Sequence, residues 1–346
     1  MTTFIQAHLL TVYPPANLNR DDLGRPKSAL FGGALRLRVS SQSLKRAWRT
    51  STVFQDRLED HLGKRTQRFG EEVEKHLKDK GAPADEAGAI AREIAGLFGK
   101  SKSTQDKNPT YTEQLAFISP EEQAAAFALA ERALAGAPID AKTAGVLHET
   151  DTAVDIAMFG RMLASSPEYS REAAVQVAHA ITTHRAVIED DYYTAVDDLK
   201  RPSEDAGASF VGEAGFGSGL FYLYVCVDRD LLIRNLGGNA TLAADGIAAL
   251  MEAAATVAPK GKQASFASRA RAAYILVEKG QTAPRTLAGA FFRPIGGEDP
   301  LAGSVAALTT LRENFARAYG DDPDMRALNV ATGVGTLGDL IDFARG

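Results

Sequence analysis

The stretch RVSSQSLKRAWR, residues 38–49, joins a strand to a helix and gives the frame for the rest of the chain. LRLRVS, residues 35–40, is typical of a short strand, and Ser40 or Ser41 can cap the helix that follows. We expect this helix to continue until Gly63. At 100° per residue, one side of it is apolar and predicts packing against a core; this side comprises Leu44, Ala47, Trp48, Phe54, Leu58 and Leu62.

The opposite side of this helix is basic. Gln42, Lys45, Arg46 and Arg49 fall within an arc of roughly 100°. Such an arc is often only the solvated face of an amphipathic helix. Here, however, the cations precede the acidic residues at 56–60, whereas the helix dipole favours the reverse order. We therefore expect a negatively charged ligand at the start of the helix.

A phosphate suits this position, because the free backbone N–H groups, the hydroxyls of Ser40, Ser41 and Ser43 and the cations would all contact it. Between Arg20 and Arg49, eight Lys or Arg residues stand against two Asp. No GxxxxGK[ST] motif accompanies them, which disfavours a mononucleotide site. The spread of charge favours an extended polyanion.

The composition of the whole chain is that of a globular protein. Its 346 residues are 45% hydrophobic and have a formal net charge of −5, so binding to nucleic acid requires a local basic surface. Cys226 is the single cysteine and lies in an apolar run, which predicts a buried thiol and excludes an intrachain disulfide. The chain shows no signal peptide and no transmembrane run, so we expect a cytoplasmic protein without membrane contact.

Three kinds of segment follow one another along the chain. Strand-like text at residues 4–14 and in the opening stretch gives way to alanine-rich helical text from Lys64 to about Ala180, which predicts a helical insertion. Two β segments that flank the polar residues 200–219 predict a hairpin arm. A helix at 241–257 and a strand at 272–278 complete the order strand, helix, strand, strand, helix, strand, which is compatible with a ferredoxin-like sheet.

Several motifs, in order and at similar spacing, closely resemble those of the CasC-type backbone subunit of the type I-E CRISPR surveillance complex Cascade, in the RAMP superfamily. They are NRDD (19–22), FGG (31–33), RVSSQSLKRA (38–47), DIAMFGRM (155–162), HAITTH (179–184), YYTAVDDL (192–199) and GLFYLYV (219–225). The resemblance implies an α+β fold: a modified ferredoxin-like, RNA-recognition-type palm (1–63 and 170–346), inserted helical fingers (64–169) and a protruding β-hairpin thumb (187–217).

The resemblance also implies a function without catalysis or cofactor, in antiviral defence. Copies of the subunit would polymerise along a CRISPR guide RNA and present its bases for pairing with target DNA. The implied partners are the guide RNA, other copies of the chain, the CasA-, CasB-, CasD- and CasE-type subunits and, through the guide, target DNA.

Site residues are carried over from the family by position. The palm residues implied to contact guide phosphates and sugars are Arg20, Lys27, Ser40, Ser41, Gln42, Lys45, Arg46 and Arg49. Lys260, Lys262 and Gln263 correspond to a second basic loop, and Met162 to an apolar residue that packs against bases. Tyr192, Tyr193 and Val196 correspond to the wedge of the thumb, which displaces one guide nucleotide at a regular interval.

Two alternatives stay open at this point. A type III-like backbone subunit would cleave target RNA with an aspartate in the loop after the first strand, where Asp21 and Asp22 lie, although they could equally pair with arginines or cap a turn. A metal enzyme is less compatible, because His179 and His184 are five residues apart and do not share a helical face. Phe159 is a further candidate for base stacking, but an aromatic residue at such spacing is more often part of the core.

Overall fold

The computed structural model describes residues 2–140, 145–163, 166–195 and 210–346. Within them, nine strands form one sheet in the order β11-β10-β1-β9-β7-β3-β2, with β6 and β8 paired to β9. These strands are β1 (Phe4–Ala16), β2 (Ser28–Phe31), β3 (Ala34–Val39), β6 (Val175–Val177), β7 (Ala180–Thr182), β8 (Glu189–Ala195), β9 (Phe210–Asp228), β10 (Ala272–Gly280) and β11 (Asp324–Asn329). All pairings are antiparallel.

β1 lies in the middle of this sheet and is buried on both faces. Alternate side chains point to opposite sides, so Ile5 and Leu9 join one core and Leu10 joins another. The first core lies under α1, α2, α7, α8, α9 and α12, and the second under η3 and α11. We call the sheet with these helices the palm; its helical elements are α1 (Ser41–Arg49), α2 (Thr52–Leu58), η1 (Glu59–His61), α7 (Val154–Phe159), α8 (Arg229–Asn235), α9 (Ala240–Thr256), α10 (Gln263–Phe266), η3 (Ala288–Phe291), α11 (Pro300–Tyr319) and α12 (Leu337–Arg345).

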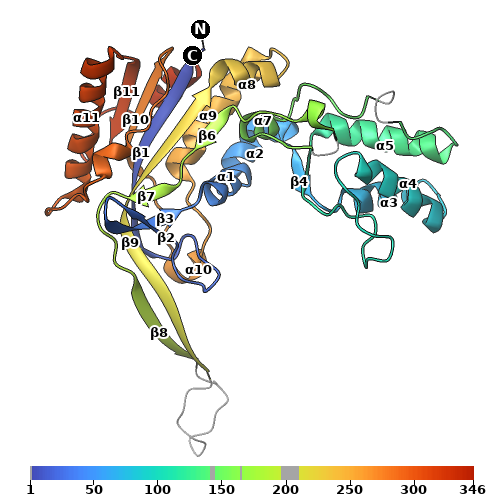
Figure 1. Cartoon of the computed structure of the whole chain (residues 1–346), viewed down its shortest axis with the longest axis horizontal. Helices are drawn as coiled ribbons and strands as arrows, with labels where there is room; N and C mark the ends of the chain where they lie inside the picture. The colour runs from blue at the N-terminus through green and yellow to red at the C-terminus, as the bar shows by residue number, and fades with distance from the viewer. Residues whose placement is uncertain (1, 141–144, 164–165, 196–209) are drawn as a thin grey trace, which may run out of the picture.

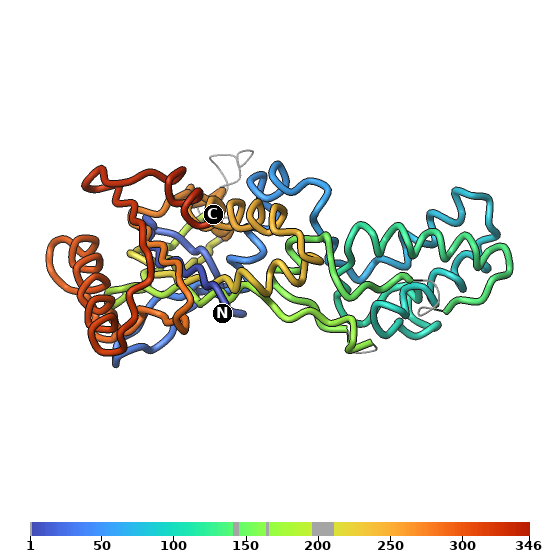
Figure 2. Tube along the Cα trace, turned by 90° about the horizontal axis from the view of Figure 1, so that it is seen from above, coloured from blue at the N-terminus to red at the C-terminus, as the bar shows by residue number. Residues whose placement is uncertain are grey.

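A second lobe extends sideways from the palm (Figures 1 and 2). It has a separate hydrophobic core that runs from Phe69 to Leu163 and includes the buried side chains of Val73, Ile94 and Leu129. We call it the fingers; it contains β4 (Lys64–Thr66), α3 (Phe69–Asp79), α4 (Ala84–Gly96), β5 (Ala116–Ile118), α5 (Pro120–Leu134) and η2 (Pro167–Tyr169). β4 and β5 form a two-stranded sheet where the chain leaves the palm.

The third feature is an arm made of β8 and the first part of β9, which projects away from the palm (Figure 1). We call it the thumb. Every residue of β8 is exposed, whereas the last part of β9 is buried between β1 and β7. The thumb is fixed at its base, because Asn17 donates to the carbonyl of Gly215 at 2.8 Å and Arg25 pairs with Asp190 at 2.8 Å.

The predicted α+β class, with an antiparallel sheet, a helical insertion and a hairpin arm, is confirmed. The order of elements inside the palm was less fully predicted, because the edge strand β11 was not expected from the sequence. No helix in the described part of the chain is long and apolar enough to cross a membrane.

Candidate nucleic-acid interface

The helix of the opening stretch is shorter than the sequence predicted. Ser40 caps it by accepting the N–H of Ser43 at 3.4 Å, but the helix ends after Arg49. The Thr50 hydroxyl donates to the carbonyl of Arg46 at 2.9 Å, and Ser51 caps the next helix, α2. Two hydroxyl side chains thus satisfy the backbone groups at both helix ends, so the expected continuation to Gly63 is wrong.

This break changes the electrostatic argument. Arg46 and Arg49 lie in the last turn of α1, where the helix dipole favours cations, so the expected conflict with the dipole does not arise for them. The predicted phasing is confirmed: Leu44, Ala47 and Trp48 are buried, while Gln42 and Arg46 are exposed. The basic face exists, but its anion-binding character depends on which cations are already paired.

Some of the cations between residues 20 and 49 already form ion pairs or hydrogen bonds with other groups of the protein. Arg49 pairs with the buried Asp155 at 2.8 Å and stacks on the ring of Phe117. Arg36 is fully buried and donates to the carbonyls of Thr182 and Phe291 at 2.9 and 2.8 Å. Arg36 therefore adds nothing to a surface, and the guanidinium of Arg49 joins α1 to Asp155. The predicted contact of Arg49 with a guide phosphate stays a prediction.

Two of the other cations, together with one from a later loop, line a groove of about 440 Å³, whose lining also contains the carboxylate of Asp21. Its lining includes Arg20 from the loop after β1, Arg46 from α1 and Lys260 from the loop after α9. None of the three forms an ion pair with any residue that the structure describes. Gly261 brings the loops together, because a Cβ at this position would lie 2.3 Å from the carbonyl oxygen of Leu18. The fold thus brings together three predicted residues from separate segments.

A second basic cluster lies beside this groove, on the surface of β3. Arg38 Nη1 and His179 Nδ1 are 2.8 Å apart. Burial, and then the charges of Arg38 and Lys27, lowers the pKa of His179, so its neutral imidazole accepts this hydrogen bond. The sequence predicted Lys27 as a contact but did not place Arg38 or His179 in the site. Two features of the sequence could have indicated these residues: the local surplus of positive charge for Arg38, and the HAITTH motif for His179.

Two other predicted contact residues have internal roles. The Ser40 hydroxyl caps α1, and the backbone N–H of Ser40 donates to Asn19 Oδ1 at 2.8 Å. Gln263 Nε2 donates to the carbonyl of Pro259 at 2.9 Å and to the Ser268 hydroxyl at 3.2 Å, which braces the loop that contains Lys260. Both side chains therefore position neighbouring backbone, and their predicted direct contact with RNA stays a prediction.

Known proteins share the sequence and the fold of this chain. A family model described as CT1975-like protein matches residues 5–339. The chain belongs to this family. The CT1975-like chain is also similar over 99% of its length to a chain of the solved structure "CRISPR RNA-guided surveillance complex, pre-nicking", with 30% identity, a TM-score of 0.87 and 99% of that chain covered. A chain of a second structure, "CRISPR RNA-guided surveillance complex", matches with 27% identity and a TM-score of 0.75, and 99% of each chain is covered. A search of curated proteins finds no match.

These similarities confirm the resemblance drawn from the sequence motifs. In the CT1975-like chain, Met162 is 87% exposed, and on the thumb Tyr192 and Tyr193 are 69% and 44% exposed, as apolar and aromatic groups that stack on bases must be. Val196, the third predicted wedge residue, lies outside the described residues. Phe159 packs against the palm core with Lys45 Nζ 5.6 Å from its ring centre, so it is a core residue, as its spacing favoured.

The loop of the CT1975-like chain that contains Asp21 and Asp22 is built as a turn. Asp21 Oδ1 accepts the backbone N–H groups of Leu23 at 3.0 Å and Arg25 at 2.9 Å, which is the turn-capping role foreseen as the structural alternative. Asp22 is exposed. Across the described ranges, no three His, Cys, Asp or Glu side chains gather where they could hold a metal ion.

Proposed function

We propose that the chain is a backbone subunit of a type I-E Cascade complex and holds CRISPR guide RNA in the groove formed by Arg20, Arg46 and Lys260. One observation carries the proposal: three exposed cations from distant segments line one groove, and none of them forms an ion pair with a residue that the structure describes. The carboxylate that also lines the groove, Asp21, accepts the backbone N–H groups of Leu23 and Arg25. Uncompensated charges repel one another, and a polyanion relieves this repulsion. The matched structures are chains of RNA-guided complexes, which supports RNA as the polyanion.

The groove suits the RNA backbone better than the bases. Its cations are exposed side chains around an open groove, and phosphate contacts of this kind position a nucleic acid without reading its sequence. Lys27 and Arg38 extend the same basic surface along β3, where His179 accepts a hydrogen bond from Arg38. Bases left free by such binding are available for pairing with target DNA.

Binding of labelled single-stranded RNA to the full chain tests the groove. Arg46→Ala and Lys260→Ala should each weaken binding about fivefold at low salt and reduce the salt slope by about 0.7, equally for RNAs of different sequence. Lys75→Ala is the matched control, because Lys75 pairs with Asp79 on the fingers and should not affect binding. Unchanged slopes for both groove variants, or losses confined to particular sequences, would contradict the proposal.

We further propose that several copies assemble head to tail on the guide, with the thumb of one copy inserted over the palm of the next. The exposed side chains of Tyr192 and Tyr193 on a projecting strand support this role. Replacing both with Ala should disturb the nucleotide interval protected from nuclease while leaving the salt slope of binding intact. An unchanged protection interval in assemblies of this variant would exclude a wedge at these residues.

The proposed subunit has no catalytic role of its own. Its loop aspartate Asp21 caps a turn with both backbone contacts in place, which supports a structural use of this carboxylate. Purified assembly incubated with complementary RNA and Mg²⁺ should leave that RNA intact. Periodic cleavage that disappears in Asp21→Ala or Asp22→Ala would show the type III-like alternative to be right.

A further inference from the structure

β4, the first strand of the fingers, brings an additional cation up to the basic face of α1. Arg65 is paired directly with Phe117 in the β4–β5 ladder, and directly opposed residues project on the same side of a sheet. The ring of Phe117 lies 4.3 Å from the Arg49 guanidinium of α1. The exposed side chain of Arg65 is therefore on the side of β4 that faces α1. Its neighbour Lys64 pairs with Glu72 of α3 at 2.7 Å.

On α1, Lys45 lies one turn before Arg49 and is half-buried against Phe159. Burial, followed by the charge of Arg65, lowers the pKa of Lys45, which is the electrostatic sign that the two cations share one region. Arg49 is neutralised by Asp155. By contrast, neither Lys45 nor Arg65 forms an ion pair among the residues that the structure describes.

We infer that Lys45 and Arg65 form a clamp that binds one backbone phosphate of the guide RNA at the junction of palm and fingers. The inference rests on the proposed function and adds to it a residue of the fingers. A phosphate oxygen accepts hydrogen bonds from an ammonium and a guanidinium together, and its charge removes their mutual repulsion. The guide would thus contact both lobes, although the groove itself belongs to the palm alone.

The position of the clamp depends on the internal contacts of Arg49. Arg49 Nε donates to Asp155, whose other carboxylate oxygen accepts the N–H of Gly63 at 2.7 Å. Gly63 immediately precedes β4, so these bonds fix the start of β4 against α1. A Cβ at Gly63 would lie 2.8 Å from the Phe117 ring, which shows how closely the strand approaches. These contacts hold the strand that bears Arg65 against the helix that bears Lys45, so that one anion can approach both cations.

Fluorescence anisotropy with a fluorescein-labelled single-stranded RNA and the full chain tests the clamp. Arg65→Ala should weaken binding about fivefold at low salt and lower the salt slope by about 0.7, whereas Arg65→Lys should retain most of the slope. Lys64→Ala is the matched control: it lies on the same strand, is already paired and should bind RNA like the unmodified chain. Because both cations contact one phosphate, the double variant Lys45→Ala/Arg65→Ala should lose less affinity than the product of the two single losses.

The outcomes separate the clamp from the groove. If Arg65→Ala and Lys64→Ala bind RNA equally well while Arg46→Ala and Lys260→Ala bind weakly, the clamp is wrong and the groove stands. If none of these variants weakens binding, the proposed function itself fails. The thermal unfolding midpoint of Arg65→Ala should be unchanged, because Arg65 is exposed and unpaired in the described part of the chain, and a selective loss of RNA affinity then assigns the effect to binding.

Discussion

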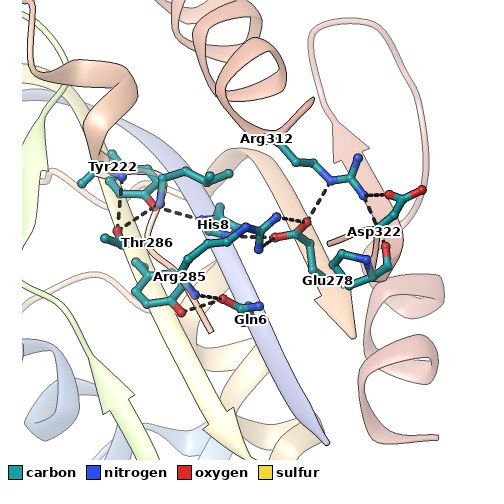
Figure 3. A network of polar contacts seen from close by, with 12 residues as sticks. Gln6, His8, Tyr222, Glu278, Arg285, Thr286, Arg312 and Asp322 are labelled. Atoms are coloured by element: carbon teal, nitrogen blue, oxygen red, sulfur yellow. Dashed lines mark hydrogen bonds and ion pairs between the residues drawn. The ribbon is translucent and has the colours of Figure 1, made fainter. Parts of the chain in front are cut away.

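Two regions of the palm concentrate cations: the face of the sheet that η3 and α11 cover, which we call the outer face, and the groove beside α1. The cations of the outer face are paired with carboxylates, whereas those of the groove are not paired with any residue that the structure describes. On the outer face, Arg285 and Arg312 converge on Glu278, which is completely buried, and each lies within 3.0 Å of it (Figure 3). In the groove, Arg20 and Arg46 are exposed and have no acidic partner within the described residues. Neutralised charge stabilises the fold, whereas charge left without a partner is available to a ligand.

Asp322 balances the second arginine of this network, because it pairs with Arg312 at 3.0 Å. His8 lies between Tyr222 at 2.9 Å and Glu278 at 3.2 Å, and the Tyr222 hydroxyl accepts the N–H of Leu287 at 3.0 Å. Burial raises the pKa of Glu278, but the hydrogen bonds from His8 and Arg285 outweigh it and lower this pKa to about 2. The network therefore joins β1, β9 and β10 to the segment before η3 and to α11.

The strongest test of this contrast is the substitution Glu278→Ala. It leaves the largely buried Arg285 without its anion and Arg312 with only the exposed Asp322 as a partner, so the free energy of unfolding should fall by about 3 kcal/mol. Urea unfolding measures this loss. Glu252→Ala is the control, because Glu252 pairs with Arg57 at the surface and should cost less than about 1 kcal/mol. Similar losses for both variants would remove the distinction between the two regions.

Arg49 has features of both groups of cations, the paired and the unpaired, and therefore tests the distinction between them. Its sequence position predicts an RNA contact, but its ion pair with the buried Asp155 predicts a structural role. Arg49→Ala should lower the free energy of unfolding by about 2–3 kcal/mol and leave the salt slope of RNA binding unchanged. Arg46→Ala should leave the free energy of unfolding nearly unchanged and reduce the salt slope of RNA binding. A reduced slope with unchanged stability in Arg49→Ala would return this residue to the RNA-binding set.

Acid should weaken the outer network and leave the groove charged. Burial lowers the pKa of His8, so below the usual value of 6.5 the unfolded chain binds a proton that the folded state resists, and stability falls as pH decreases. Glu278 adds a further loss as pH falls from about 4.5 towards 2. Burial raises the pKa of Asp151 to about 6, which acts in the opposite direction, so the contribution of His8 is measured as a difference between variants. Between pH 7 and pH 5, urea unfolding should show a larger loss of stability, or a smaller gain, in the unmodified chain than in His8→Gln. The exposed His148, replaced by Gln, is the control and should keep the full difference.

The smallest expected effect on stability comes from placing a carboxylate in the groove. Ser43 lines it and lies in the first turn of α1, where the dipole favours an acidic side chain. Ser43→Glu should raise the free energy of unfolding by about 0.5 kcal/mol and weaken RNA binding about fivefold at low salt, less so at high salt. Ser43→Ala should leave RNA binding nearly unchanged. Unweakened binding in Ser43→Glu would mean that the groove does not hold RNA.

Much of the fold was predictable because it depends on local patterns. Strands β1 and β10 and helix α9 follow from alternation and helical periodicity, and their bounds agree with the expected ones to within about two residues. The burial of Leu44 and Trp48 followed from phasing alone. The end of α1 could not be predicted in this way. The same residues could form one long helix or two short ones, and the hydrogen bonds of the Thr50 and Ser51 side chains stabilise the two short helices.

The sequence by itself determined the chemistry of the site: a local excess of cations, the motif order of the family and the apolar stripe that orients α1. Only the tertiary structure decided which cations are available. Arg36, Arg46 and Arg49 are close in sequence, yet one is buried among carbonyls, one is exposed and one is paired with Asp155. The physical reason is that a charge is neutralised by groups brought near it in space, and these come from segments up to 255 residues away along the chain.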